Sequence, residues 1–218
     1  MKILMIGNSA TYVNDIPKLL EKLISENGTE ATVDSVTKGG RKLYENLAEG
    51  DQYGERIKQL VAENKYDVLF LQEQTCLPLW DRKGFSDSVS KLMDIVKAEK
   101  TVLYATPPRK EGAKFLKQST LTVYGMTRGI INAYKFAARK NKATLSPVTM
   151  CFYNVMTSHP ELELHAPDRA HCSYVGSCIA TLSHYKAIFG VLPESCASLG
   201  IDADTLAIIK EGVSATKA

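Results

Sequence analysis

The sequence predicts one α/β domain whose five-stranded, mainly parallel sheet is covered on both faces by helices. Short apolar runs with no polar face recur along the chain, as expected for strands that are buried on both sides. Stretches with a helical spacing of apolar residues separate these runs, and this alternation is typical of parallel sheets. No repeat, linker or low-complexity segment divides the 218 residues. We therefore interpret residues 1–218 as a single domain.

Five segments are expected to form the strands. Residues 2–7 (KILMIG) are mostly apolar and end in glycine, and residues 67–71 (DVLFL) and 101–105 (TVLYA) follow a similar pattern. Residues 31–36 and 143–148 complete the set. Because parallel strands run in the same direction, their carboxyl ends should meet at one edge of the sheet. Right-handed crossovers are expected to link them.

Helices are expected between and after these strands. The first begins near Asp15, has Pro17 in its first turn and ends at Asn27-Gly28. The other helical patterns cover residues 42–48, 54–64, 85–98, 123–141, 173–189 and 202–212. Residues 149–169 have no regular pattern, so we expect a long irregular loop there, and its residues 149–167 should shape specificity.

The composition argues against several classes of partner. The net charge is only +3 and the 27 basic residues are spread along the chain, so we interpret the denser patches at 110–117 and 139–142 as solvated helix faces and expect no nucleic-acid partner. No run is long enough to span a membrane, and the apolar stretch 3–6 is too short for a signal peptide. With five cysteines and no CxxC pair, these features favour a cytoplasmic chain with reduced thiols, although a chain trimmed at its N-terminus would look the same.

Polar residues directly after predicted strands are the candidates for chemistry, because ligands of open α/β sheets bind at the carboxyl ends of the strands. Ser9 follows the first strand. A serine needs a base to become a nucleophile, and His171 is the candidate base. Asp168 precedes His171 by three residues, so its carboxylate can reach one ring nitrogen within a local turn and leave the other for Ser9. These three residues are predicted to form a catalytic triad.

Attack by Ser9 on an ester carbonyl would create an oxyanion, which needs hydrogen-bond donors that are already in place. The candidate donors are the backbone N–H groups of Ser9 and Gly40 and the side-chain amide of Gln74 or Gln72. Both glutamines follow the third predicted strand, and the two-residue period of a strand would place them on the same face.

In chain order, Gly7-Asn8-Ser9-Ala10-Thr11, Gly40, Gln72-Glu73-Gln74-Thr75 and Asp168-Arg169-Ala170-His171 resemble the four sequence blocks of the SGNH (GDSL-type) hydrolase superfamily. The first and third blocks are most similar to its GNS-type bacterial branch of largely uncharacterised proteins, and the resemblance extends from residue 2 to about residue 190. It implies a three-layer α/β/α flavodoxin-like fold. It also implies Ser9 as nucleophile, Asp168 and His171 as the rest of the triad, and Gly40 and the amide of the third block as oxyanion donors.

The same resemblance implies an esterase that needs no metal or other cofactor. We expect its partner to be a small acyl ester, and family analogy favours an O-acetyl group on a carbohydrate. The sequence does not indicate an oligomeric state.

Two departures from the family pattern stand out. Asn8 occupies a position where the superfamily commonly has Asp, but that position is not the nucleophile. The third block lacks the Gly-x-Asn-Asp pattern, so Gln74 or Gln72 must replace its Asn, and we prefer Gln74. This unusual block also leaves open a second hypothesis, a catalytically weak domain that binds a sugar or another small ligand in the same cleft.

The remaining histidines and Cys172 are assigned to structure. His159 and His165 lie in the expected loop without metal-ligand spacing, so we interpret them as part of a solvated loop and predict no metal site. His184 lies on the helix predicted at 173–189 and is expected either at the surface or in the core of the protein. Cys172 is neither at a strand end nor near a second base, so a buried thiol is favoured over an alternative nucleophile.

Overall fold

The computed structural model describes residues 1–216 and has a five-stranded, fully parallel sheet in the order β2-β1-β3-β4-β5. All five predicted strands are present, with ends that differ by up to two residues from the predicted ones. Their bounds are Lys2–Gly7 for β1, Thr32–Thr37 for β2, Val68–Leu71 for β3, Lys100–Tyr104 for β4 and Thr144–Ser146 for β5.

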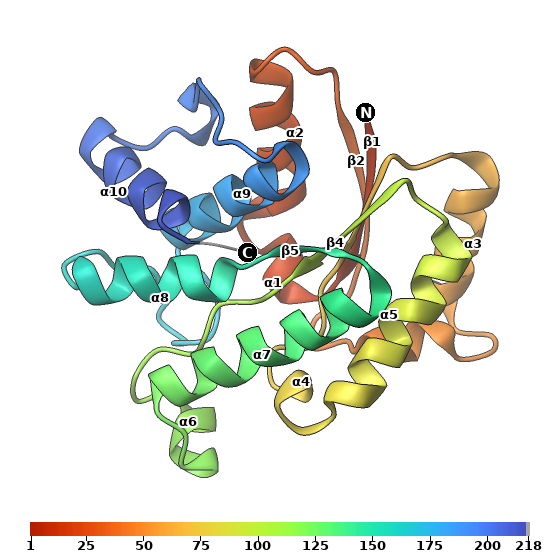
Figure 1. Cartoon of the computed structure of the whole chain (residues 1–218), viewed down its shortest axis with the longest axis horizontal. Helices are drawn as coiled ribbons and strands as arrows, with labels where there is room; N and C mark the ends of the chain where they lie inside the picture. The colour runs from red at the N-terminus through yellow and green to blue at the C-terminus, as the bar shows by residue number, and fades with distance from the viewer. Residues whose placement is uncertain (217–218) are drawn as a thin grey trace.

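Helices cover both faces of this sheet, so the predicted three-layer α/β/α architecture is confirmed (Figure 1). One face carries α2 (Ile16–Glu26), α8 (Val148–Ser158), α9 (Tyr174–Phe189) and α10 (Ala203–Ser214), and the other carries α3 (Gln52–Glu63), α5 (Arg82–Val96) and α7 (Val123–Asn141). Shorter elements are α1 (Ser9–Tyr12), α4 (Leu77–Trp80), α6 (Lys114–Ser119) and the 3₁₀ turns η1 (Val13–Asp15), η2 (Leu43–Leu47) and η3 (Ala197–Leu199).

The alternation of side chains along β1 divides the apolar core into two clusters. Ile3 and Met5 pack with α2 and α9 on one face, whereas Leu4 and Ile6 pack with α3, α5 and α7 on the other. A strand buried on both faces needs apolar residues at every position, which explains why the KILMIG run has no polar side.

The prediction of an irregular loop over residues 149–169 is wrong for its first half, because Val148–Ser158 forms α8. Its buried residues Val148, Cys151, Phe152 and Val155 have the i, i+3, i+4, i+7 spacing of one helix face. They pack in the same cluster as α9 and α10. The pattern is short and interrupted by threonine and asparagine, so the apolar face becomes evident only once its partner helices are in place.

The strand order creates the edge at which a site can form. From β1 the chain crosses to β2 on one side and then returns to β3 on the other, so the carboxyl ends of β1 and β3 lie at a topological switch point. Ile6 pairs with Leu71 in the parallel register. The segments that follow these two residues, Gly7–Ser9 and Gln72–Gln74, therefore leave the sheet side by side.

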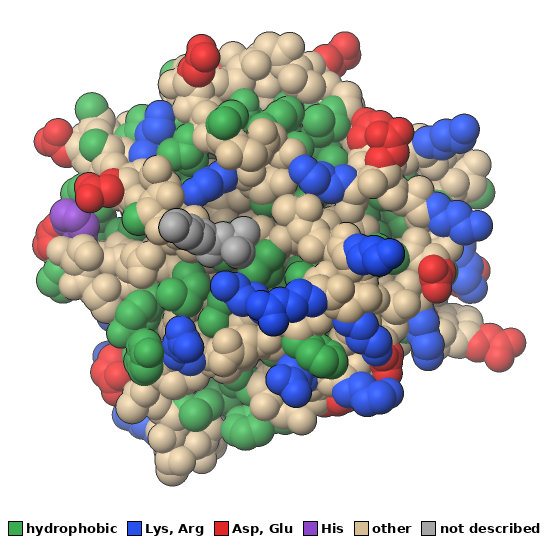
Figure 2. Space-filling view, viewed as in Figure 1, with side chains coloured by type: hydrophobic (Ala, Val, Ile, Leu, Met, Phe, Trp, Pro, Cys, Tyr) green, Lys and Arg blue, Asp and Glu red, His purple; other side chains and the backbone are tan. Residues whose placement is uncertain are grey.

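The surface in Figure 2 carries Lys and Arg side chains over α7, interspersed with neutral residues and some acidic ones. Lys140 at the end of α7 pairs with Asp87 of α5 at 2.6 Å. Across residues 1–216, none of the helices is both long enough and apolar enough to cross a bilayer.

Gly7 is predicted to be irreplaceable for packing at the end of β1. A Cβ at this buried position would lie 2.5 Å from both Gln72 Oε1 and Thr11 Oγ1. We expect Gly7→Ala to lower the free energy of unfolding by about 1–3 kcal/mol in urea titrations. Gly39→Ala, where an added Cβ meets only the Tyr12 hydroxyl at 3.1 Å, is the matched control, and equal stability of both variants would contradict the prediction.

Candidate active site

Ser9 begins α1 directly after β1, with Asn8 as the helix N-cap. Asn8 Oδ1 accepts a hydrogen bond from the Ala10 N–H at 3.1 Å, which fixes the turn that carries the serine. Ser9 Oγ lies 2.8 Å from Nε2 of His171, although 162 residues separate the two in sequence. The fold thus brings the predicted nucleophile and base within hydrogen-bonding distance.

Asp168 is bonded to His171 on the other side of the imidazole. Its Oδ2 lies 2.5 Å from His171 Nδ1, and its Oδ1 accepts from the N–H groups of Ala170 and His171, each at 2.9 Å. Arg169 makes this tight turn possible with a left-handed φ of 60°. The predicted Asp-x-x-His turn is therefore present, and it fixes the ring so that Nε2 faces Ser9.

The carboxylate of Asp168 is stabilised as an anion. Desolvation alone would raise its pKa, but the hydrogen bonds from His171 and Ala170 outweigh that effect and hold the pKa well below its ordinary value. The Asp168 side chain keeps 49% of its exposure and that of His171 keeps 34%. His171 lines the cavity beside Ser9, and both side chains stay partly open to solvent.

Asn8 links the serine to the two neighbouring strand ends. Its backbone N–H donates to Gln72 Oε1 at 2.8 Å, and its side-chain Nδ2 donates to the Arg41 carbonyl at 2.9 Å. Asn8 is only 4% exposed. Buried polar groups that have all their partners hold a single arrangement, so these bonds fix Ser9 relative to the loops after β2 and β3.

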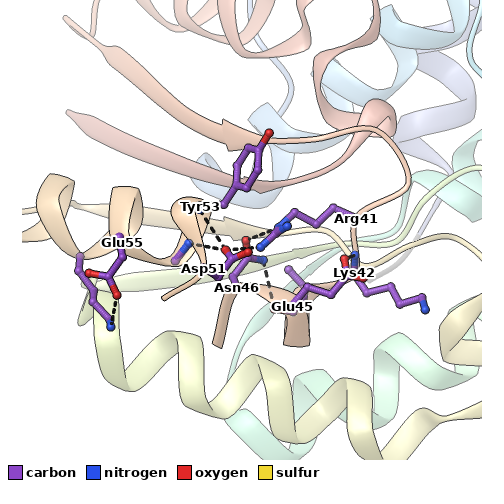
Figure 3. Close-up of polar contacts among 10 residues, drawn as sticks. Arg41, Lys42, Glu45, Asn46, Asp51, Tyr53 and Glu55 are labelled. Atoms are coloured by element: carbon purple, nitrogen blue, oxygen red, sulfur yellow. Dashed lines mark hydrogen bonds and ion pairs between the residues drawn. The ribbon is translucent and has the colours of Figure 1, made fainter. Parts of the chain in front are cut away.

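Arg41, the residue after Gly40, is held by the polar contacts drawn in Figure 3. Its guanidinium forms an ion pair with Asp51, donates to Asn46 Oδ1 at 2.7 Å and stacks over the Tyr53 ring at 4.4 Å. The Arg41 side chain is 6% exposed. Because its charge is paired and its ring-facing surface is covered, Arg41 serves as a rigid support for Gly40.

Three hydrogen-bond donors face the cleft beside Ser9. Gln74 Oε1 accepts from the N–H groups of Cys76 and Leu77 at 2.9 and 3.0 Å, which leaves its Nε2 free to donate. Within residues 1–216, no group accepts a hydrogen bond from this Nε2 or from the backbone N–H groups of Ser9 and Gly40. All three residues line one cavity with His171, and its volume is about 50 Å³.

Gln72 occupies a different place from Gln74. Its Oε1 accepts from Asn8 N–H and from Thr11 Oγ1 at 2.9 Å, and its Nε2 donates to the Glu73 carbonyl at 2.5 Å. Gln72 is 1% exposed and does not line the cavity. The geometry therefore favours Gln74 as the donor and makes Gln72 a support for the serine turn.

Glu73, which sequence reasoning did not single out, joins the loop that follows β2 to the segment that follows β3. Its carboxylate accepts from the Leu43 N–H at 3.1 and 3.2 Å and from its neighbour Gln74 N–H at 2.6 Å. Tyr134 Oη accepts from the Glu73 N–H at 3.1 Å. Burial raises the pKa of Glu73 to about 7, against the lowering effect of these backbone donors.

His165 corrects a second expectation, because it is buried and not part of a solvated loop. It is 3% exposed, its Nε2 lies 3.0 Å from the Pro108 carbonyl, and burial lowers its pKa. Cys172 is buried as predicted, and burial raises its pKa to about 12. A thiol of that kind is a poor nucleophile at neutral pH.

Several other predictions for the surroundings of the site can be compared with the structure. None of residues 149–167, all of which are described, lines the cavity, so the segment expected to shape specificity lies elsewhere. His184 lies fully buried in the core. All five cysteines, which fall within residues 1–216, are free. The same residues contain no group of three or more His, Cys, Asp or Glu side chains arranged to hold a metal ion.

The fold is similar to those of known proteins. A "putative SGNH hydrolase" from Slackia heliotrinireducens is 28% identical, and the match covers 86% of this chain and 98% of that one with a TM-score of 0.77. A DUF4886 family protein from Bacteroides uniformis is 18% identical, with coverage of 98% and 93% and a TM-score of 0.80. The lipase/acylhydrolase from Enterococcus faecalis is also 18% identical, with coverage of 89% and 98% and a TM-score of 0.63.

No protein-family model matches the chain, and no curated protein matches it. The likeness to solved structures nevertheless extends over most of the chain and agrees with the four sequence blocks. The fold is therefore that of the SGNH (GDSL-type) hydrolase superfamily, as the resemblance of the sequence blocks implied.

Glu73 is predicted to make the stability of the protein depend on pH. Its pKa is about 7 in the folded state against an ordinary 4.5, so the folded protein binds this proton more tightly than the unfolded chain does. The contribution of Glu73 to the free energy of unfolding is therefore fully present below about pH 4.5 and is lost as the pH rises through 7. We expect Glu73→Gln, which cannot titrate, to gain up to about 3 kcal/mol relative to wild type over that interval.

Urea unfolding of both proteins at a series of pH values measures this difference. Glu49→Gln, at an exposed carboxylate, corrects for the loss of one negative charge. The assignment would be contradicted if the difference in free energy of unfolding between wild type and Glu73→Gln stayed constant as the pH rises. It would also be contradicted if that difference moved in favour of wild type.

Proposed function

We propose that the protein is a serine esterase that cleaves a short acyl ester through an acyl-enzyme, with Ser9, His171 and Asp168 as its catalytic triad. The observation that carries the proposal is the continuous chain of contacts from Asp168 through the imidazole to Ser9 Oγ, with distances of 2.5 and 2.8 Å. This is the arrangement that general-base activation of a serine requires.

The first half of the reaction forms the acyl-enzyme. His171 Nε2 takes the proton of Ser9 Oγ as that oxygen attacks the ester carbonyl. The carbonyl oxygen becomes an oxyanion, which the N–H groups of Ser9 and Gly40 and the Gln74 amide would stabilise. The imidazolium, held by Asp168, then gives its proton to the departing alcohol.

Water completes the cycle. His171 removes a proton from a water molecule, the resulting hydroxide attacks the acyl carbon, and Ser9 Oγ leaves and recovers its proton from His171. Only the triad and the three N–H donors are needed for these steps. The acid is released and the enzyme returns to its starting state.

The small cavity supports a short acyl group. Its volume of about 50 Å³ accommodates a group of few heavy atoms, since about 10–15 Å³ on this scale holds one water molecule. An acetyl ester fits this space, and an O-acetylated carbohydrate is the substrate that we propose on family analogy.

Ser9→Ala is expected to abolish hydrolysis of p-nitrophenyl acetate, with a loss of at least about 10³-fold in kcat, because no nucleophile remains. A fluorophosphonate probe, read by mass spectrometry, should label Ser9 in the wild type. Ser35→Ala, at an exposed serine of the edge strand β2, is the control and should retain full activity.

Equal esterase rates in Ser9→Ala and wild type would refute the proposal. Saturable binding of a sugar to a wild-type protein that the probe does not label would favour the catalytically weak binding domain instead.

Gln74→Ala is expected to lower kcat by about 10²–10³-fold with little change in KM, because the amide is needed only when the oxyanion forms. Gln74→Asn, which keeps an amide on a shorter side chain, should recover part of the rate. Because Gln74→Ala also removes the acceptor of the Cys76 and Leu77 N–H groups, thermal unfolding must establish that both variants are folded at the assay temperature. A Gln74→Ala enzyme with wild-type kcat would exclude this side chain as an oxyanion donor.

A further inference from the structure

An arginine without a carboxylate partner lies in the wall of the candidate active site. Arg109 follows β4 through Pro107 and Pro108 and lines the same cavity as Ser9 and His171. It was not among the residues singled out in the sequence. The strand-end rule that identified Ser9 applies to it equally, because β4 ends at the same edge of the sheet as β1.

The guanidinium of Arg109 is held in place by neutral groups. Nη1 of the guanidinium donates to the Ala170 carbonyl at 2.6 Å, and the backbone N–H of Arg109 donates to Met126 Sδ at 3.4 Å. His165 Nε2 bonds the preceding Pro108 carbonyl at 3.0 Å. The side chain is therefore oriented before any ligand arrives, which reduces the entropy that binding must cost.

The charge of Arg109 is not neutralised within the described part of the chain, where no carboxylate oxygen lies within 4.0 Å of its guanidinium. The buried Arg41 differs in this respect because it pairs with Asp51, and Lys110 pairs with Glu163. Asp168 accepts from His171 and from two backbone N–H groups instead. The guanidinium contacts the Ala170 carbonyl and the Cys76 thiol, both of them uncharged, so this half-buried cation keeps donors available to an anion.

We propose that Arg109 binds a carboxylate on the alcohol portion of the ester, so that the enzyme prefers acetyl esters of anionic alcohols. The inference rests on the proposed esterase function. Arg109 is bonded to Ala170, the residue before His171, and His171 is the group that protonates the departing alcohol. The anion therefore belongs to the leaving group, while the short acyl group occupies the space beside Ser9, Gly40 and Gln74. A concave site around an unpaired cation concentrates such substrates.

Two acetyl esters of similar shape test the proposal, namely 4-acetoxybenzoate and its neutral methyl ester. The measured quantity is the ratio of kcat/KM for the anionic ester to kcat/KM for the neutral one. Wild type should favour the anionic ester, and the preference should shrink as the ionic strength rises. Arg109→Gln should lower the ratio by about 10- to 100-fold, as expected for one charged hydrogen-bonded contact.

Two further variants keep the test specific. Arg109→Lys retains the charge without the forked geometry and should give an intermediate ratio. Lys110→Gln removes a neighbouring charge whose partner, Glu163, does not line the cavity, and it should leave the ratio unchanged. Circular dichroism and thermal unfolding establish that each variant is folded.

The outcomes separate the two proposals. If Arg109→Gln slows both esters equally, Arg109 acts only by positioning the loop before His171, and anion recognition is refuted while the esterase function stands. If wild type hydrolyses both esters without preference, the inference is refuted in the same way. If wild type hydrolyses neither, the esterase function itself fails.

Discussion

The position of Ser9, the proposed nucleophile, depends on Asn8, each of whose polar groups has a partner inside the protein. Its backbone N–H donates to Gln72, its Nδ2 donates to the Arg41 carbonyl, and its Oδ1 and backbone carbonyl accept from the N–H groups of Ala10 and Thr11. A buried amide whose oxygen and nitrogen both have partners has one favourable orientation, and losing a partner costs about 1–3 kcal/mol. The ends of β1, β2 and β3 are fixed to one another through this residue.

The two departures from the family pattern belong to this one network. An aspartate at position 8 would lack the N–H donor that meets the Arg41 carbonyl, and its negative charge would face that oxygen. Gln72 supplies the acceptor for the Asn8 N–H and for Thr11 Oγ1. The Gly-Asn-Ser start and the Gln-Glu-Gln-Thr block are thus complementary halves of one set of hydrogen bonds. Gln72 is hydrogen-bonded within this network through both its amide oxygen and its amide nitrogen, and Gln74 is the glutamine that lines the cavity.

The sequence predicts those features that depend on local pattern and strand ends. Buried strands and the Asp168-His171 turn follow from apolar runs and short spacing, so both were predictable. The two-residue period failed to separate Gln72 from Gln74, because β3 ends at Leu71 and the glutamines lie beyond the pleat. Glu73 and Arg109 were missed for another reason. Their roles depend on burial and on the absence of a carboxylate partner, and both arise only when distant segments pack.

The cleft consists of two halves that are held separately and then joined. Asn8 and Glu73 hold the half with the proposed oxyanion donors, whereas bonds from Arg109 to Ala170 and from His165 to Pro108 hold the half with the proposed base, His171. Asn14, in a left-handed conformation with φ of 55°, connects them by donating to the carbonyls of Cys172 and Ser173 and to Ser177 Oγ. Asn14 lies five residues after Ser9, and Cys172, the first of its partners, directly follows His171. Bonds so close to Ser9 and His171 explain how these side chains, 162 residues apart, maintain a 2.8 Å contact while the cavity beside them stays open to solvent.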